Sequence, residues 1–389
     1  MNTEASRPIY LDHNATTPVA PEVVEAMLPF LTADFGNPAS VEHVYGNIAQ
    51  EAVAQARKQV ASSLGARDNE IIFTSGCTEA NNIALLGAAR ARPDRKHLVA
   101  SVIEHPAVLE PLAHLAKEGF EVSLVPVDAD GKVDPCAIES AIRPDTGVVS
   151  VMGANNEVGT IQPIREIGAI CAEQDVWFHS DLAQLMAHRA VDVVECGLHL
   201  ASVSAHKAYG PKGVGALYVR SRSPRVRIEP VMFGGGQERG LRAGTVPTHL
   251  VVGLGKALAV AQNLRDTDNQ RLEKMQQMLV RIFRDEIAEF SINGDTEHRL
   301  PNNLSLSIAG VEPLALIHRL NSVASFSASS ACATGKVETS HVLQAMFGDS
   351  ERARGAFRIS PGRYTTEAEL ETFADALIAA IADLRRYAA

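Results

Sequence analysis

The chain has 389 residues, 46% of them hydrophobic and 21% charged, and its formal net charge at pH 7 is −10. This composition predicts a globular protein of two domains and excludes an intrinsically disordered, collagen-like or disulfide-stapled protein. The acidic balance argues against direct binding of nucleic acid or of an anionic membrane surface, and the lack of a membrane-spanning apolar run or a secretory signal predicts a cytoplasmic protein.

Short β-branched segments alternate with helical patterns along the first part of the chain. In chain order we expect strands at 70–73, 97–103, 121–127, 147–152, 176–178, 200–203 and 214–219, and helices at 78–90, 107–118 and 163–174. This rhythm predicts an α/β fold with a mostly parallel sheet that helices cover on both faces. Residues 248–289 have the pattern of one or two long helices, and residues 300–389 mix strands and helices as in a smaller α+β domain. The N-terminal arm, residues 1–20, is expected to pack away from the large sheet.

Polar side chains follow five of the predicted strands where each strand ends. These groups lie at 74–79, 104–105, 155–157, 179–184 and 204–207. Because ligands of open α/β sheets bind beyond the carboxyl ends of the strands, we expect these groups to surround one site. Loops are polar in general, but that accounts poorly for a lysine, an aspartate and histidines at one edge.

Residues from three of these groups could each bind a different part of one cofactor. Ser75 and Thr78 open a predicted helix whose first N–H groups are unpaired, which is typical of a phosphate site. Lys207 follows an apolar strand and could form a Schiff base with an aldehyde cofactor. Asp181 ends a buried strand and needs a cationic partner, such as a protonated pyridine nitrogen. Each signal alone is weak, since Ser and Thr cap ordinary helices and a single Lys is usually a solvated charge, but their combination indicates pyridoxal 5'-phosphate.

The chain has five cysteines, an odd number without any C-x-x-C pair, so we expect neither a disulfide framework nor a zinc site. Cys136, Cys171 and Cys196 lie in or beside apolar segments and are predicted to be small buried residues. Cys332 lies in a stretch of small residues, 325–335, that predicts an exposed loop. A thiol there suits the delivery of sulfur or is an incidental loop cysteine, and these residues alone leave both open.

Motifs along nearly the whole chain extend this interpretation. They are YLDHNATTP (10–18), FGNPAS (35–40), FTSGCTE (73–79), NNEVG (155–159), SAHKAYGPKGVG (204–215), GGGQERGLRAGT (234–245), SSAC (329–332) and RISPGRYTT (358–366). In these motifs and their order the chain resembles the cysteine desulfurases of the NifS/IscS type, in the class V aminotransferase-like branch of the fold-type I pyridoxal-phosphate enzymes. The resemblance implies an aspartate aminotransferase-like fold, with a large cofactor-binding domain at 16–258. It also implies a small domain from 1–15 and 259–389, with the catalytic-cysteine loop at about 322–340.

The resemblance further implies a role for each matching residue. Lys207 matches the lysine that binds the cofactor, His105 the catalytic imidazole that stacks on its ring, and Cys332 the nucleophile that becomes a persulfide. Asn156 and Arg358 match the groups that hold the substrate carboxylate. The other implied cofactor ligands are Cys77 (through its backbone), Thr78, Asp181 (ring nitrogen), Gln184 (ring hydroxyl), Ser204, His206 and Thr245, the last donated by the other subunit of a homodimer. No metal is implied.

The implied reaction converts L-cysteine to L-alanine and leaves the sulfur on Cys332 for an acceptor protein. The acceptor stays open among an iron–sulfur cluster scaffold, a tRNA-thiolating enzyme and a DNA sulfur-modification system. A selenocysteine lyase or another class V enzyme is one alternative, and a catalytically idle binding partner is another; Cys332 argues against the first and the full set of site residues against the second. The basic cluster Arg220, Arg222, Arg225 and Arg227 is interpreted as a solvated or acceptor-docking face, because the chain as a whole is acidic.

Overall fold

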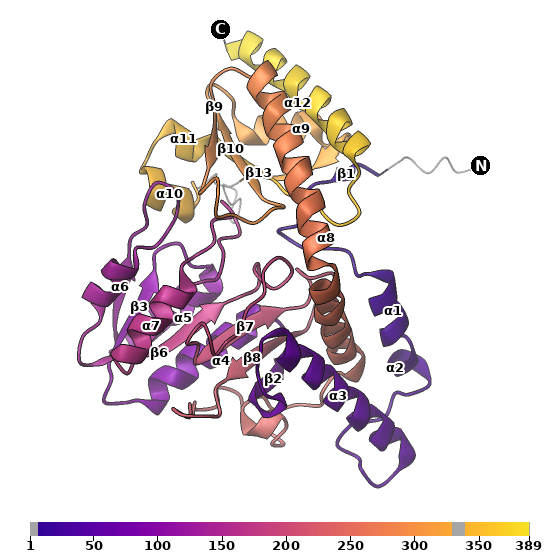
Figure 1. The fold of residues 1–389 in the computed structure, drawn as a ribbon, viewed down its shortest axis with the longest axis vertical. Coiled ribbons are helices and arrows are strands. Elements are labelled where there is room, and N and C mark those ends of the chain that lie inside the picture. Colours follow the sequence, from indigo (N-terminus) through magenta and orange to yellow (C-terminus); the bar gives the residue numbers. More distant parts are fainter. Residues whose placement is uncertain (1–6, 329–338, 389) are drawn as a thin grey trace.

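The computed structural model describes residues 7–328 and 339–388, with side chains as far as residue 386. Within these residues the chain forms a large α/β unit and a smaller α+β unit, which the long helix α8 (Thr248–Glu286) connects (Figure 1). No helix in this part of the chain is both long and apolar enough to cross a membrane.

A seven-stranded sheet forms the centre of the large unit. Its strands lie in the order β2 (Ile71–Thr74), β8 (Gly215–Val219), β7 (Leu200–Ser204), β6 (Trp177–Asp181), β5 (Thr146–Ser150), β3 (His97–Ser101) and β4 (Glu121–Val125). The predicted mostly parallel sheet is confirmed, because all strands from β7 to β4 are parallel. Only β8 runs antiparallel to both of its neighbours. Ten residues join β7 to β8, too few for the helical crossover that a parallel return requires.

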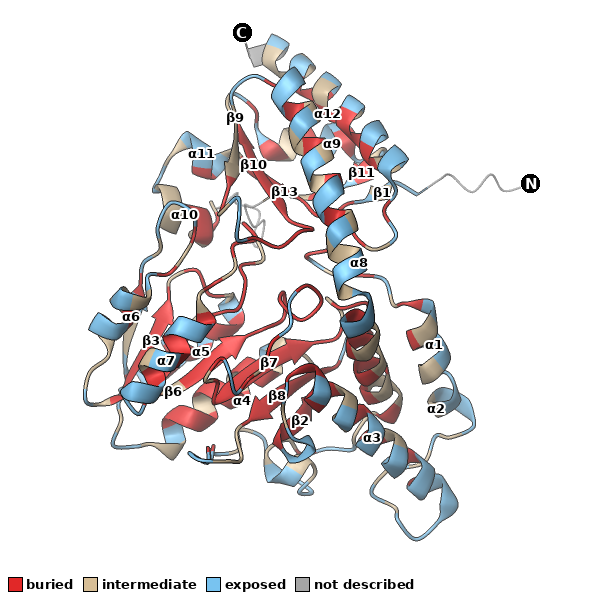
Figure 2. Cartoon of the chain, viewed as in Figure 1, coloured by how far each residue is buried: buried red, intermediate tan, exposed pale blue. Residues whose placement is uncertain are grey.

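Helices cover both faces of this sheet, as predicted (Figure 1). On one face α4 (Cys77–Ala91) and α5 (Pro106–Lys117) pack against Leu98 and Leu217. On the other face α3 (Val44–Ser63), α7 (Ile164–Glu173) and the first half of α8 pack against Phe73 and Val149. Figure 2 shows the central strands buried along their length and the outer faces of the helices exposed. The remaining helices of this unit are α1 (Pro21–Met27), α2 (Pro29–Thr32) and α6 (Pro135–Ala141).

The small unit has its own sheet and its own core. Four antiparallel strands lie in the order β12 (Ser327–Ala328), β13 (Ala356–Ile359), β10 (Leu304–Ile308) and β9 (Phe290–Asn293). The N-terminal arm joins this unit through β1 (Ile9–Tyr10), which pairs with β11 (Ala324–Ser325). Its helices are α9 (Pro313–Leu320), α10 (His341–Phe347), α11 (Glu351–Arg354) and α12 (Glu367–Ala388).

Helix α8 is a single helix of 39 residues that contributes to both cores. Val251 and Leu258 belong to the core of the large unit, whereas Leu279 and Phe283 belong to that of the small unit. The predicted domain boundary between residues 258 and 259 falls inside this helix, so the domain limits remain a prediction.

Two of the three cysteines predicted to be buried are buried. Cys171 and Cys196 lie in the core, but Cys136 is exposed, so the prediction for Cys136 was wrong. Cys136 lies in the first turn of α6, which buries only Ile138 against the rest of the protein. The apolar neighbours in the sequence therefore do not share the environment of this thiol.

Candidate active site

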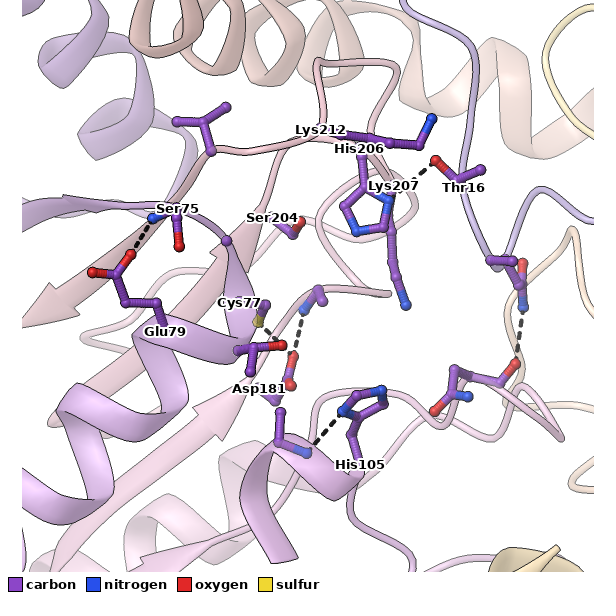
Figure 3. Close-up of a pocket in the computed structure, with 18 of the residues that line it drawn as sticks. Thr16, Ser75, Cys77, Glu79, His105, Asp181, Ser204, His206, Lys207 and Lys212 are labelled. Atoms are coloured by element: carbon purple, nitrogen blue, oxygen red, sulfur yellow. Dashed lines mark hydrogen bonds between the residues drawn. The ribbon is translucent and has the colours of Figure 1, made fainter. Parts of the chain in front are cut away.

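The carboxyl ends of β2, β3, β5, β6 and β7 surround a cavity of about 600 Å³ (Figure 3). Of the residues predicted for the site, those that line it are Cys77, Thr78, His105, Asn156, Asp181, Ser204, His206, Lys207 and Arg358. The N-terminal arm adds Asn14 and Thr16 to the wall. The loops after five strands therefore meet at one cavity, as expected from the strand ends, and Arg358 joins them from the small unit.

One end of the cavity is formed by the start of α4. Gly76 precedes the helix without any side-chain cap, which leaves the first N–H groups of α4 available to a ligand. Gly215 passes directly beside this turn: a Cβ there would lie 2.5 Å from the carbonyl oxygen of Val203 and 2.8 Å from the backbone carbon of Gly76. Ser204 adds a buried Oγ without a hydrogen-bond partner in the described chain. A helix N-terminus beside a free hydroxyl is an arrangement that fits a phosphate group.

Two basic side chains extend from the turn after β7. Figure 3 shows Lys207 pointing into the cavity. Burial lowers the pKa of Lys207, and the nearby charge of Asp181 partly opposes this effect. His206 Nδ1 lies 3.2 Å from Thr16 Oγ1, and burial, together with the charges of two lysines, lowers the pKa of His206 to about 4. His206 is therefore neutral at pH 7 and contributes hydrogen bonds rather than charge.

Asp181 ends β6 with its carboxylate held by three donors. Asn81 Nδ2 donates to Oδ2 at 2.8 Å, and the backbone N–H of Ala183 donates to Oδ1 at 2.9 Å. Cys77 Sγ lies 3.2 Å from the same Oδ1 (Figure 3). The carboxylate is buried, and no cationic side chain of residues 7–328 or 339–386 is bonded to it, which fits the expected pyridinium partner.

His105 is both the N-cap of α5 and part of the cavity wall. Its Nδ1 accepts the N–H of Ala107 at 3.0 Å, so the neutral ring carries its proton on Nε2. Burial lowers the pKa of His105, with the Asp181 charge acting in the opposite direction. The imidazole is therefore a neutral ring at pH 7, held in one orientation by the helix that it caps.

The small unit contributes Arg358 of β13 to the cavity wall. Its Nη1 donates to the carbonyl oxygen of Asn156 at 2.7 Å, and its Nη2 donates to Asp12 Oδ1 at 2.6 Å. The Nε of Arg358 is buried without a partner in the described chain. A guanidinium with an unused donor at the cavity wall fits a planar carboxylate ligand.

Some predicted residues do not line this cavity. Gln184 is buried and donates from Nε2 to the carbonyl oxygen of Asn14 at 2.9 Å. Thr245 is exposed on the surface of this chain. His179, one of the histidines in the strand-end groups, lies in the sheet instead, between Ser150 Oγ at 2.8 Å and Ser202 Oγ at 3.1 Å. Cys332 lies outside the described residues.

Comparison with known proteins supports the family that the sequence motifs indicated. The model of the class-V aminotransferase family matches residues 9–373. A cysteine desulfurase IscS of Rickettsia bellii is 46% identical over 375 residues, which are 95% of this chain and 91% of that protein. The chain belongs to the class-V aminotransferase family, among the cysteine desulfurases of the NifS/IscS type.

Solved structures agree with this assignment. The structure of a NifS-like protein matches this chain with a TM-score of 0.89 and 36% identity, over 97% of this chain and 100% of the other. A structure described as SspA in complex with cysteine matches with a TM-score of 0.79 and 36% identity, over 92% of this chain and 100% of the other.

Three residues that shape this cavity were not predicted from the sequence. Asp12 is the ion-pair partner of Arg358, and Asn81 binds Asp181. Asn14, which is almost fully buried, accepts from Gln184 and from Asn302 Nδ2. The arm motif at residues 10–18 is the signal that could have led to Asp12 and Asn14, whereas Asn81 has the pattern of an ordinary helix residue.

Proposed function

We propose that this cysteine desulfurase uses pyridoxal 5'-phosphate to convert L-cysteine to L-alanine and holds the released sulfur as a persulfide on Cys332. The observation that carries the proposal is the shared cavity. A lysine with a lowered pKa, a buried aspartate, a free helix N-terminus and an arginine with an unused donor all face one space of about 600 Å³. These groups match the aldehyde, ring nitrogen and phosphate of the cofactor and the carboxylate of an amino acid.

The residues present fit the cofactor at each of its ends. The start of α4 and the unpartnered Ser204 Oγ would bind the phosphate, with neutral His206 as a further hydrogen-bonding group. Asp181 would accept the ring N–H, and Lys207 would form the covalent link. When bound, pyridoxal phosphate withdraws electrons from the Cα of an attached amino acid, which makes the Cα proton acidic.

The chain's own groups then orient the substrate and move protons. Arg358 would hold the substrate carboxylate by its free donor, with Asn156 beside it. Burial lowers the pKa of Lys207, which favours a neutral Nζ that can take a proton from the substrate Cα and return it. His105 packs at the wall as a neutral ring whose Nε2 proton is available to a reacting group.

The chain segments on either side of Cys332 are fixed beside this cavity. Before it, β12 pairs with β13 so that Ser327 lies opposite Arg358. After it, His341 Nε2 donates to the carbonyl oxygen of Glu104 at 2.9 Å, next to His105. Both anchors support a Cys332 thiolate that attacks the substrate sulfur. The S–S bond would form as the substrate Cβ–S bond breaks, and Cβ would take up a proton to give alanine.

Incubation of the purified protein with L-cysteine tests this proposal. We expect the wild type to release alanine and the variant Cys332→Ala to lose this activity. Undiminished alanine release by the variant would remove Cys332 as the nucleophile and favour a lyase that acts on cysteine or selenocysteine. Absence of alanine from both forms, with the cofactor bound, would contradict the proposed substrate.

We also propose a homodimer in which Thr245 reaches the cofactor phosphate of the other subunit. Large apolar side chains stay exposed on α2, on α3 and in the segment between them, among them Leu31 at 53%, Phe35 at 69% and Val44 at 68%. Phe233, exposed at 82%, lies at the start of the segment that leads to Thr245. A second copy that covers this apolar face would bring Thr245 toward its partner.

The proposed dimer is tested by sedimentation. We expect the wild type to sediment as a dimer and Phe233→Asp to shift it toward monomer, because a charge in the interface is left without a partner. Thr245→Val should keep the dimer but weaken cofactor binding. A wild type that sediments as a monomer with full activity would contradict the arrangement.

A sulfur-acceptor protein and a cytoplasmic location complete the proposal. Cys77, Cys136, Cys171 and Cys196 are all free thiols, which suits a reducing compartment.

In the basic cluster, Arg222 pairs with the buried Glu70 at 3.1 Å, whereas Arg225 and Arg227 remain exposed. These two arginines are available to an acidic acceptor protein, and their substitution should lower sulfur transfer without lowering alanine formation.

A further inference from the structure

The cavity contains a thiol to which the proposed reaction gives no role. Cys77 lines the wall at the start of α4, in a protein that is proposed to carry sulfur on a different cysteine. Its Sγ lies 3.2 Å from Asp181 Oδ1 (Figure 3). Because the carboxylate already accepts two N–H groups, the thiol is the donor in this contact and the carboxylate is the acceptor.

The acceptor positions of Asp181 can be counted. An ionised carboxylate has about four lone-pair positions, two on each oxygen. Oδ1 accepts from Cys77 Sγ and from the N–H of Ala183, so both of its positions are used. Oδ2 accepts from Asn81 Nδ2 and keeps one position with respect to the described residues.

We propose that Cys77 and Asn81 are positioning residues for Asp181, which fill its carboxylate so that the one remaining position, on Oδ2, receives the N–H of the pyridine ring. The identity of that ring rests on the function proposed above. Cys77 is then a hydrogen-bond donor and not a second carrier of sulfur.

The environment of Asn81 supports this assignment. Its side chain is fully buried, and its Oδ1 has no partner in the described chain. The contact with Asp181 is therefore the only hydrogen bond of this amide among the described residues. The opposite orientation would place the amide oxygen against the carboxylate, so the negative charge of Asp181 fixes which end of Asn81 faces it.

The environment of Cys77 supports a donor rather than a nucleophile. Burial raises the pKa of the Cys77 thiol well above its usual range, and the Asp181 charge raises it further, while Lys207 offsets only part of this. Thiolates, not thiols, attack sulfur. A thiol that stays protonated keeps its S–H for the carboxylate.

Cofactor affinity is the first test. The apoprotein is titrated with pyridoxal phosphate for the wild type, Asn81→Leu and Cys77→Ala. Asn82→Leu is the matched control, since Asn82 is the next residue of the same helix and donates to the carbonyl oxygen of Thr78 instead of to Asp181. We expect the Kd to rise about tenfold for Asn81→Leu and about threefold for Cys77→Ala, because S–H is the weaker donor. Affinities of both variants equal to that of Asn82→Leu would overturn the proposal.

Thiol labelling is the second test, and it needs neither cofactor nor substrate. Iodoacetamide at pH 8 is applied to the wild-type apoprotein, with the exposed Cys136 as the reference thiol in the same molecule. We expect Cys77 to be labelled at least tenfold more slowly than Cys136, and Asp181→Asn to speed only Cys77. Equal labelling of both thiols in the wild type would overturn the assignment. A separate measurement on the holoenzyme also bears on it: a persulfide on Cys77 after addition of L-cysteine would overturn the donor role.

The two tests separate this inference from the proposed function. If the apoprotein does not bind pyridoxal phosphate at all, the proposed function fails, but slow labelling of Cys77 that depends on Asp181 would still show the contact. If the cofactor binds and Cys77 is labelled as fast as Cys136, only the positioning role fails.

Discussion

A substitution at Ser204 should affect ligand binding without affecting folding stability. Its Oγ is buried without a partner in the described chain, so the hydroxyl contributes no hydrogen bond to the fold. We expect Ser204→Ala to leave the free energy of unfolding of the apoprotein within about 0.5 kcal/mol of the wild type. The same change should raise the Kd of pyridoxal phosphate about fivefold, because a hydrogen bond to a charged phosphate is lost. Calorimetry and a cofactor titration measure the two effects, and a large loss of stability without loss of affinity would contradict the assignment.

The residues that the sequence could predict are those that follow strands. Lys207, Asp181 and His105 come directly after apolar strand segments, and parallel strands bring such positions to one edge of a sheet. Asp12 could not be found in this way, because its partner Arg358 is 346 residues away along the chain. Asn81 is a further example, since it lies within a helix and meets Asp181 only when the helix packs on the sheet.

At the scale of secondary structure, the phosphate end of the site depends on close packing between α4 and β8. A Cβ at Gly215 would lie 2.5 Å from the carbonyl oxygen of Val203 in β7 and 2.8 Å from the backbone of Gly76, so an alanine there must displace β8 from both. We expect Gly215→Ala to lower the free energy of unfolding by about 2 kcal/mol and cofactor affinity by about tenfold. The control is Gly147→Ala in β5, where the nearest atoms to a new Cβ lie 3.2 Å away. Equal cofactor affinity in both variants would show that the turn tolerates the displacement.

The sequence predicted the parallel strands because their apolar runs are buried on both faces, and such runs stand out. It gave no sign of the direction of β8, whose apolar run is like that of its neighbours. The continuity of α8 was also hidden: its first half packs in one core and its second half in another, so its apolar face serves two different partners. These features depend on tertiary contacts rather than on local pattern.

For the whole molecule, buried histidines predict a loss of stability in mild acid. Burial lowers the pKa of both His179 and His188 to about 4 in the folded protein, against a usual value of 6.5. Between pH 6.5 and 4 the unfolded chain therefore binds more protons than the folded one, so the free energy of unfolding falls as the pH falls through this window. Above pH 6.5 the contribution of these two neutral histidines to the free energy of unfolding is fully present. By pH 4 the free energy of unfolding has fallen by on the order of a few kcal/mol.

A variant of one of these histidines isolates the effect. His188→Gln cannot take up a proton but keeps a donor for Asn269 Oδ1, which lies 3.1 Å from His188 Nδ1. Thermal unfolding from pH 8 to pH 4 should show a shallower decline for this variant than for the wild type. Parallel declines would mean that His188 does not contribute to the acid sensitivity.

Covalent trapping shows directly whether this chain holds pyridoxal phosphate on Lys207, as proposed. The purified protein is reduced with borohydride and digested, and the peptide that carries the cofactor is identified by mass spectrometry. Among the described residues, two lysines line the cavity and could carry it, Lys207 and Lys212. We expect the adduct on Lys207 and its absence from Lys207→Ala. An adduct on Lys212, or a wild type that binds the cofactor without any trapped adduct, would contradict the proposal.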